Sequence, residues 1–164
     1  MIDSLFKELF SSIVNVGIDK WKDNEQFRAL RLIAHEKISR ELRCNLECLS
    51  SSNPKDQSIY MKALKMDSFA ELSATSIPID EIFATKAEAF IPAGEKLSDR
   101  IRKTINSDVV LSRMLDRVYN RIGILGLRIN EGLPLGDVSY LRSLIKLSLK
   151  GVEHGREELR GRFK

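Results

Sequence analysis

The feature that most constrains the fold is an apolar stripe between residues 27 and 49. Its members recur every three or four positions: Phe27, Leu30, Ala34, Ile38, Leu42, Leu46 and Leu49. This spacing is close to the 3.6-residue period of an α-helix and places all of them on one face. We therefore expect a long amphipathic helix that begins after a cap at Asp23 or Asn24. At about 1.5 Å per residue it spans roughly 40 Å, which is long enough to set the length of a helical bundle.

Three further segments show the same helical period. Residues 2–21 form one apolar face, residues 97–130 form a second that bends or restarts at Ser107–Asp108, and residues 138–152 form a third. No stretch of useful length alternates apolar and polar residues as a β-strand does. Short connections between long helices favour antiparallel neighbours. The sequence therefore predicts an all-α fold, an up-down helical bundle of about four long helices plus one or two short ones.

The number of helices is open in residues 66–95. Asp67–Ser68 interrupts one helical stretch, and Ser76–Ile77–Pro78 begins a shorter helix that extends to about Lys86. After Gly155 the last helix is expected to fray into a charged tail over residues 155–164. The length is that of one ordinary domain, so residues 1–164 are interpreted as a single unit.

Two glycines lie inside the helix predicted to end near Asn130. Gly123 and Gly126 each cost about 1 kcal/mol there relative to alanine. Close packing of a neighbouring backbone is the explanation that we expect for them.

Composition favours a globular protein of the cytoplasm. Hydrophobic residues make up 43% and charged residues 30% of the chain, which argues against wholesale disorder. The two cysteines, Cys44 and Cys48, are too few for a secreted disulfide framework and are expected to remain reduced. No run approaches the ~20 apolar residues that a spanning helix needs, so no transmembrane segment is predicted.

Charge is distributed unevenly along the chain. Residues 1–95 hold 12 basic and 15 acidic residues, a net charge of −3, whereas residues 96–164 carry +7. Two basic rows at helical spacing contribute to the second half: Arg113, Arg117 and Arg121, then Arg142, Lys146 and Lys150. If their helices are neighbours, these rows form a positive patch for phosphates, nucleic acid or an acidic partner. Aromatic residues for base stacking are not interleaved with them, and an ordinary solvated face is the alternative.

Polar residues interrupt the apolar stripe of residues 27–49. Asn45 falls in the middle of that face, and Glu41 flanks it. Because an unpaired buried amide costs about 1–3 kcal/mol, these side chains need partners if the face is buried. A hydrogen-bonded network that fixes helix register is one interpretation, and a ligand site inside the bundle is the other.

One pair on the same helix resembles a catalytic motif. Arg28 and His35 are seven residues apart, which returns them to nearly the same side of a helix. This Arg-x6-His pattern resembles the signature of the HEPN ribonuclease superfamily, whose members are also all-helical. Ala29 stands where that family usually has a polar residue. The resemblance implies that the arginine and histidine of a dimer line a cleft and act on an RNA phosphodiester and its 2′-hydroxyl.

No other pattern indicates a reaction. His35 and His154 lack the Glu-x-x-His spacing of di-iron bundles, and the two cysteines do not complete a four-ligand zinc site. We therefore predict neither a metal nor a cofactor. The favoured function is non-enzymatic, with the bundle acting through protein–protein contacts. Residues 2–21 then pack in the core or serve as the oligomerisation arm of a homodimer. A HEPN-like ribonuclease and a phosphate or nucleic-acid binder are the alternatives.

Overall fold

The structure of the chain, a computed structural model, describes residues 25–50, 59, 61–75, 77–106 and 108–161. The long helices in these ranges are α2 (Glu25–Ser50), α7 (Leu111–Asn130) and α8 (Ser139–Gly161). Short elements connect α2 to α7: α4 (Asp67–Ser73), α5 (Ile79–Ile82), the 3-10 turn η2 (Ala87–Ala89) and α6 (Asp99–Arg102). The helix predicted for residues 2–21 lies outside the described residues.

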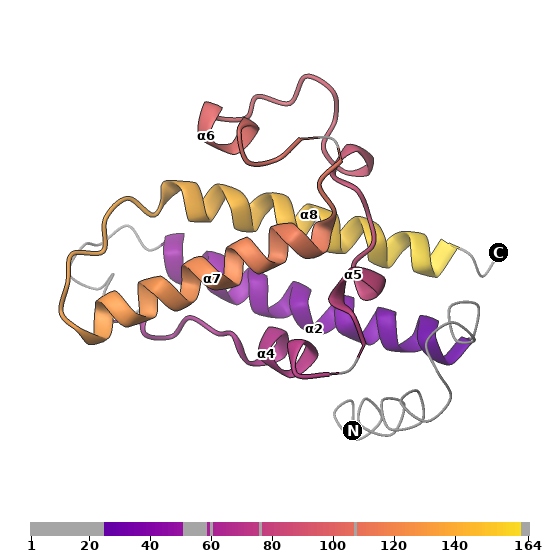
Figure 1. Cartoon of the computed structure of the whole chain (residues 1–164), viewed down its shortest axis with the longest axis horizontal. Coiled ribbons are helices and arrows are strands. Elements are labelled where there is room, and N and C mark those ends of the chain that lie inside the picture. Colours follow the sequence, from indigo (N-terminus) through magenta and orange to yellow (C-terminus); the bar gives the residue numbers. More distant parts are fainter. Residues whose placement is uncertain (1–24, 51–58, 60, 76, 107, 162–164) are drawn as a thin grey trace.

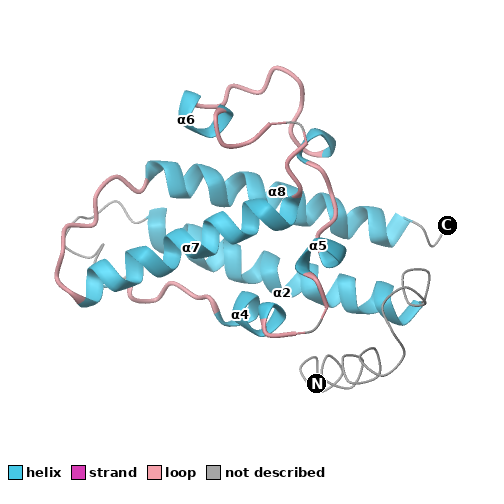
Figure 2. Cartoon of the chain, viewed as in Figure 1, coloured by secondary structure: helices cyan, strands magenta, loops and turns pink. Residues whose placement is uncertain are grey.

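The long helices lie side by side and form the body of an all-α bundle (Figure 1, Figure 2). α7 and α8 run antiparallel, as expected for neighbours joined by a short connection. α8 is also antiparallel to α2, because Arg28 near the start of α2 bonds to Leu159 near the end of α8. α2 and α7 therefore point the same way, and the short elements between them return along the bundle. None of the helices in the described ranges is both long and apolar enough to cross a membrane.

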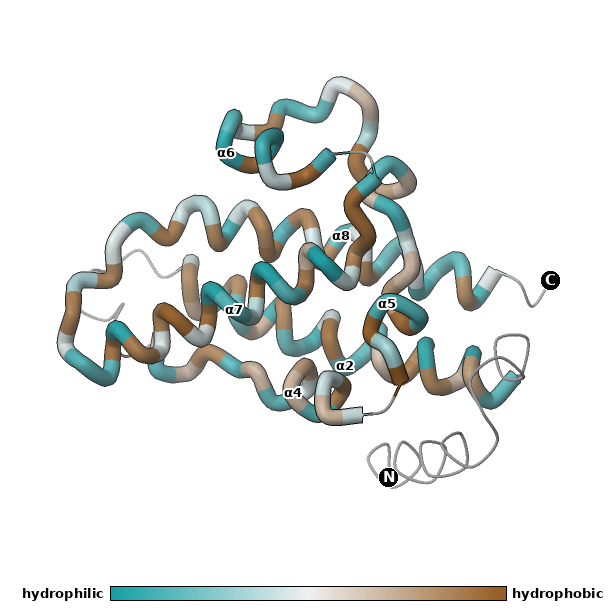
Figure 3. Tube along the Cα trace, in the orientation of Figure 1, coloured by the Kyte–Doolittle hydropathy of each residue, from teal (hydrophilic) through white to brown (hydrophobic). Residues whose placement is uncertain are grey.

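The core is built from the apolar faces that the sequence predicts. Figure 3 shows hydrophobic residues interspersed with hydrophilic ones along each long helix. Burying an aliphatic side chain of this size contributes about 1.5–3 kcal/mol, so these faces hold the bundle together. The buried members include Phe27, Leu30, Ala34, Ile38, Leu42 and Leu49 on α2, Leu111, Leu115, Val118, Ile122 and Leu125 on α7, and Leu141, Leu144, Ile145 and Val152 on α8.

The region between α2 and α7 contains less helix than the sequence predicts. The expected interruption is present, because α4 begins at Asp67. The prediction that the next helix extends to about Lys86 is wrong, because α5 ends at Ile82. The helix expected from Leu97 onward is also too long, since α6 comprises only the 4 residues Asp99–Arg102.

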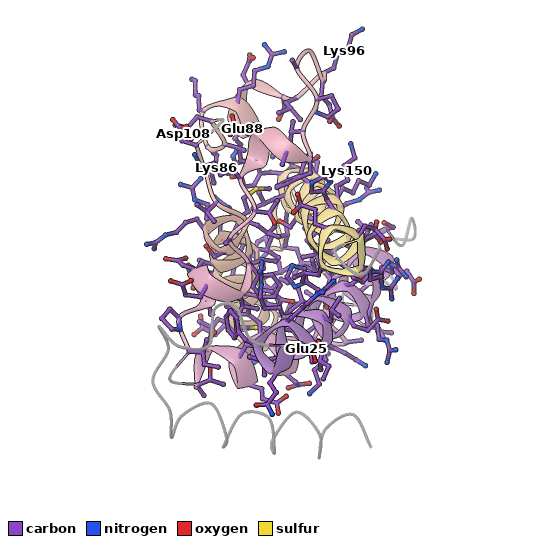
Figure 4. The ribbon with its side chains drawn as sticks, turned by 90° about the vertical axis from the view of Figure 1, so that its right-hand side faces the viewer. Glu25, Lys86, Glu88, Lys96, Asp108 and Lys150 are labelled. Carbon is purple, nitrogen blue, oxygen red and sulfur yellow. The ribbon has the colours of Figure 1, made fainter. Side chains whose placement is uncertain are left out.

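Pairing between two extended segments explains why these helices are short. Lys86 and Val110 form an isolated antiparallel β-bridge. The amide of Leu111 donates to the carbonyl of Thr85 at 2.8 Å. Figure 4 shows Lys86 and Asp108 close together where the two segments meet. Because residues near Val110 are extended, α7 starts afresh at Leu111, and it has no side-chain cap from the predicted pair at Asp108.

The prediction of close packing at Gly123 and Gly126 is wrong. A Cβ added at Gly123 would meet only the side chain of Met66, at 3.7 Å, and one at Gly126 would meet nothing within 4 Å. The backbone of α7 is therefore open at Gly126, whereas the side chain of Met66 packs against Gly123.

The close approach occurs instead at two glycines of α8. A Cβ at Gly155 would lie 2.7 Å from Nε2 of His35, and one at Gly151 would lie 2.8 Å from the ring of Phe90. Real Cβ atoms do not approach other heavy atoms this closely, so neither position has room for a side chain. These glycines let α2 and η2 pack directly against the backbone of α8.

Contacts with α2 also extend α8 beyond the point where the sequence predicts a frayed tail. α8 remains helical to Gly161, and Leu159 is buried. Nε of Arg28 donates to the carbonyl of Leu159 at 2.8 Å, and Nη2 of Arg28 donates to the same oxygen. The last carbonyls of a helix lack partners within it and attract cations, so Arg28 stabilises this end.

Substitution of glycine by alanine tests the contact between α2 and α8. Gly155→Ala is expected to lower the free energy of unfolding by about 1–3 kcal/mol, because the added methyl group overlaps the ring of His35. Gly126→Ala is the matched control, and its gain in helix propensity raises stability by up to about 1 kcal/mol. Urea denaturation measures both values. Equal effects of the two substitutions would contradict the close contact.

Candidate interaction surface

Large hydrophobic side chains remain exposed on and near the end of α7. Within the described ranges these are Ile59, Ile124, Leu127 and Leu133, with exposed fractions of 66%, 57%, 64% and 47%. Ile59 lies one turn before Lys62, which lines a groove together with Leu127. Single exposed leucines are ordinary, but a cluster of large aliphatic side chains indicates a contact surface. We call these four residues the apolar end surface.

A groove runs along each side of the ridge that Ile124 and Leu127 form on α7. One groove is lined by Ile124, Leu125 and side chains between residues 135 and 141. The other is lined by Leu127, by both glycines of α7 and by side chains between residues 61 and 66. A helix packs against another by inserting ridges into grooves, and this surface offers both.

The chain reversal after α7 brings Leu133 to this surface. The amide of Gly132 donates to the carbonyl of Ile129 at 3.1 Å, and the amide of Leu133 donates to that of Arg128 at 2.8 Å. These bonds form a Schellman motif, in which the residue after the helix has a positive φ. Gly132 has a φ of 67°, a conformation that glycine adopts at low cost. The turn satisfies the last carbonyls of α7 and places Leu133 directly after the ridge.

Sequence periodicity did not single out Ile124 and Leu127. At about 100° per residue they lie roughly 140–160° from the centre of the buried stripe of α7, on the face expected to be polar. The signal was the presence of two large aliphatic residues on that polar face, close to Asn120 and Arg121. Such residues belong to no apolar stripe, so helical periodicity does not reveal them.

Arginine side chains border the apolar end surface. The guanidinium carbon of Arg121 lies 4.5 Å from the ring centroid of Tyr140, and that of Arg100 lies 4.4 Å from the same centroid. The hydroxyl of Tyr140 donates to Oγ1 of Thr104 at 3.2 Å. Arg128 lines the same groove as Arg121. Cation–π contacts hold the two stacked guanidinium groups in place without neutralising their charge.

The side chains of the predicted basic row on α7 are exposed, and each of them contacts another group of the chain. A terminal nitrogen of Arg113 lies 3.8 Å from a carboxylate oxygen of Asp80. Arg117 donates to the carbonyl of Thr104, and Arg121 stacks on a ring as described above. The row therefore leads along the outer face of α7 towards the apolar end surface.

The predicted basic row on α8 faces the segment that carries α6. Lys150 pairs with Glu95 at 2.5 Å, and Lys146 lines a shallow groove with that residue. Arg142 is half-buried, and its Nε has no hydrogen-bond partner among the described residues. Figure 4 shows Lys150 on α8 below the loop that contains Lys96. This loop segment contacts both basic rows through Glu95 and Thr104.

Arg28 and His35 do not meet in an open cleft. Arg28 bonds to the last turn of α8. His35 has no exposed surface, its Nδ1 lies 2.8 Å from the carbonyl of Arg31, and its ring centroid lies 4.6 Å from that of Phe83. The ribonuclease hypothesis needs both side chains in a cleft that RNA can enter, and the burial of His35 does not favour it.

Burial keeps the imidazole of His35 neutral. Its Nδ1 faces a carbonyl and so carries the hydrogen, which leaves Nε2 as a bare lone pair with no partner among the described residues. Burial lowers the pKa of His35 from 6.5 to about 4, with smaller contributions from the charges of Arg31 and Arg156. A group with so low a pKa is a weak base at neutral pH.

Glu41 and Asn45 are both buried, and both bind backbone groups at the start of α4. Nδ2 of Asn45 donates to the carbonyl of Lys65 at 2.8 Å, and Oδ1 accepts from its amide at 2.7 Å. Glu41 accepts hydrogen bonds from the amides of Ser68 at 2.8 Å and Phe69 at 3.3 Å. α4 has no side-chain cap of its own, so a carboxylate on α2 caps it. Both buried side chains therefore have hydrogen-bond partners on the backbone.

Comparisons with known protein families, with curated proteins and with solved structures find no match to this chain. Among the residues that the structure describes, no group of three or more His, Cys, Asp and Glu side chains could hold a metal ion. The features of the chain's own surface are therefore the basis for proposing a function.

The burial of His35 makes stability depend on pH. Between pH 6.5 and about 4 the unfolded chain binds a proton at this residue and the folded chain does not. The free energy of unfolding is therefore expected to fall as the pH drops through this window, by up to about 1.4 kcal/mol per pH unit and roughly 3 kcal/mol in total. His35→Leu should lack this contribution. Urea denaturation at a series of pH values across the window measures it.

His154→Gln is the control for this experiment, because His154 is the chain's other histidine and lies half-buried on α8. It should retain the pH dependence of the unsubstituted chain. Carboxylates titrate in the same range in all three proteins, so the difference between variants isolates the buried imidazole. The same loss of stability in all three would show that His35 is not the group responsible.

Removal of the Asn45 amide tests whether it anchors the segment before α4. Asn45→Leu is expected to lower the free energy of unfolding by about 1–3 kcal/mol, because both bonds to Lys65 are lost. Asn120→Leu makes the same change at an exposed position of α7 and should stay within about 0.5 kcal/mol of the unsubstituted chain. Chemical denaturation measures both. A rise in stability for Asn45→Leu would argue against the anchoring role.

Proposed function

We propose that the chain is a non-enzymatic helical-bundle protein that binds another protein through its apolar end surface. The observation that carries this proposal is the exposure of Ile124 and Leu127 on α7 beside two grooves. Leu133 just after α7, and Ile59 one turn before the groove residue Lys62, are exposed as well. Covering apolar surface is favourable by about 25 cal/mol per Å², so a partner's apolar side chains gain by docking here. The two grooves beside the ridge provide concave surfaces for such side chains.

A cytoplasmic location fits the thiols of the chain. Cys44 and Cys48 are free and lie one turn apart on α2. Burial raises the pKa of Cys48, and the neighbouring Cys44 adds to this effect. The thiol of Cys48 therefore stays protonated and unreactive at neutral pH, as suits a residue with a packing role in a reducing compartment.

The alternative functions have less support. A ribonuclease needs an accessible imidazole, and His35 is fully buried. A binder of single-stranded nucleic acid gains from exposed aromatic rings, and the aromatic side chains of the described residues are all buried. Arg113 and Lys150 of the basic rows already have carboxylate partners. Both alternatives remain hypotheses.

A photo-crosslinking amino acid at the position of Leu127 tests the proposal in cells that make the protein. We expect it to capture proteins that the same probe at Glu158, an exposed position near the end of α8, does not capture. A captured protein, once purified, should bind the unsubstituted chain at least about tenfold more tightly than it binds Ile124→Asp. A charge placed in an apolar contact costs at least about 1.4 kcal/mol, which corresponds to that factor.

The control for this test is that the Ile124→Asp variant remains folded. Ile124 is 57% exposed, so Ile124→Asp should leave the helical circular dichroism and the unfolding midpoint nearly unchanged. Crosslinking at Leu127 no different from that at Glu158 would count against a docking surface at the end of α7. Equal affinity of the captured protein for the chain and for Ile124→Asp would do the same.

A further inference from the structure

We propose that the segment that docks on the apolar end surface is an acidic amphipathic helix. Its apolar face covers Ile124 and Leu127, and its carboxylates pair with Arg121 and Arg128. This inference rests on the proposed function and adds the chemistry of the partner. It depends on the charge beside the ridge, on the way that this charge is held and on the shape of the surface.

The charge beside the ridge is not neutralised within the described part of the chain. Neither Arg121 nor Arg128 forms an ion pair there. Other cations of the same helices and loops do form ion pairs: Lys37, Arg40, Arg43, Arg113, Lys150, Arg156 and Arg160. The charges of Arg121 and Arg128 therefore stay available beside the ridge, where they attract carboxylates and repel basic partners.

Among the described side chains, one carboxylate lines the two grooves, and it compensates only part of this charge. The lining side chains include three cations, Arg121, Arg128 and Lys62, and one anion, Asp137. Asp137 accepts hydrogen bonds from the hydroxyl and the amide of Ser139, each at 2.8 Å. These bonds lower the pKa of Asp137, and they commit its oxygens to the start of α8. Glu131, the exposed residue that follows α7, adds a second anion, so three cations against two anions leave one positive charge for a partner.

Arg121 is already held before a partner binds. Stacking on Tyr140 fixes the guanidinium of Arg121, and the ring itself is only 7% exposed. Arg100 stacks on the same ring, and Arg117 bonds to the backbone of Thr104. A side chain that is already ordered loses less conformational freedom when it pairs. Arg121 can therefore pair with a partner's carboxylate at a low entropic cost, although that pair would itself be exposed.

The shape of the surface suits a helix. Ile124 and Leu127 are three residues apart and form a ridge, and the grooves on both sides receive the side chains of a crossing helix. At Gly126 nothing lies within 4 Å of a Cβ position, so a second backbone can approach α7 closely. An apolar ridge flanked by cations matches a helix with an apolar stripe flanked by carboxylates.

A second copy of this chain is a poorer match. A two-fold contact between antiparallel α7 ridges would bring Arg121 of one copy towards Arg128 of the other. Like charges at such a contact repel each other and disfavour the assembly. An acidic helix replaces this repulsion with attraction.

Two synthetic helical peptides with the same apolar face test the inference. Both carry leucines at positions i, i+3, i+4 and i+7 and a fluorescent label, with flanking glutamates in one peptide and flanking lysines in the other. Fluorescence anisotropy with the full chain measures both dissociation constants at low and high NaCl concentration. We expect the glutamate peptide to bind roughly three- to tenfold more tightly at low salt, because exposed ion pairs each contribute little. Salt screening should remove most of this preference.

Charge variants assign the preference to its residues. The double variant Arg121→Gln, Arg128→Gln should bind the two peptides equally. The control double variant Lys86→Gln, Lys96→Gln removes the same charge from the region of η2 and the loop before α6 (Figure 4) and should keep the preference. Leu127→Asp should weaken the binding of both peptides, because the apolar contact is lost.

The outcomes separate this inference from the docking surface itself. Equal binding of both peptides, lost in Leu127→Asp, would leave the docking surface in place and overturn the acidic partner. Binding of neither peptide would overturn the helical partner, and the crosslinking experiment at Leu127 would still decide on docking. Binding to phosphatidylserine vesicles, or a dimer in sedimentation velocity, that is lost in Leu127→Asp would assign the surface to a membrane or a second copy and would also overturn the inference.

Discussion

The contact between His35 and the bare backbone of Gly155 sets the distance between α2 and α8. An imidazole that is enclosed on this side must be neutral, and it must face a helix that has no side chain at the point of contact. Because α2 and α8 lie this close together, ion pairs also form between them. Arg156 pairs with Glu36 at 2.9 Å, and Arg43 pairs with Glu153 at 2.5 Å. Packing in this bundle therefore depends on the absence of one side chain as much as on the presence of others.

The long helices could be predicted because their apolar periods are strong and local. The faces of α2, α7 and α8 were identified correctly from the spacing of aliphatic residues alone. The extent of α8 could not be found in this way, because its last turn is ordered by Arg28, which lies far away in sequence. The breaks around Ile82 and Val110 likewise come from pairing between two distant extended segments. Local propensity carries no information on such pairing.

The roles of individual residues were harder to predict than the helices. Asn45 and Glu41 could be identified as buried polar groups, but their partners are backbone atoms near Lys65 and Ser68, and no sequence pattern links the two. The glycines of α7 and of α8 look alike in the sequence, and only tertiary contacts decide which of them meet a neighbour. Exposed Ile124 shows the same limit, since the apolar period of a helix indicates which residues it buries and not which apolar residues it leaves exposed.

The hydrogen bond from Arg28 to Leu159 joins residues 131 positions apart. During synthesis α2 leaves the ribosome long before α8 exists, so its apolar face lacks its main covering helix for most of that time. Until α8 arrives, the segments around α4 and α5 can cover part of α2, through the backbone contacts of Glu41 and Asn45 and the packing of Phe83 on His35. The contacts of Glu41 and Asn45 join residues 20 to 28 positions apart, so they can form long before the contact between Arg28 and Leu159. The core closes only when α8 has emerged.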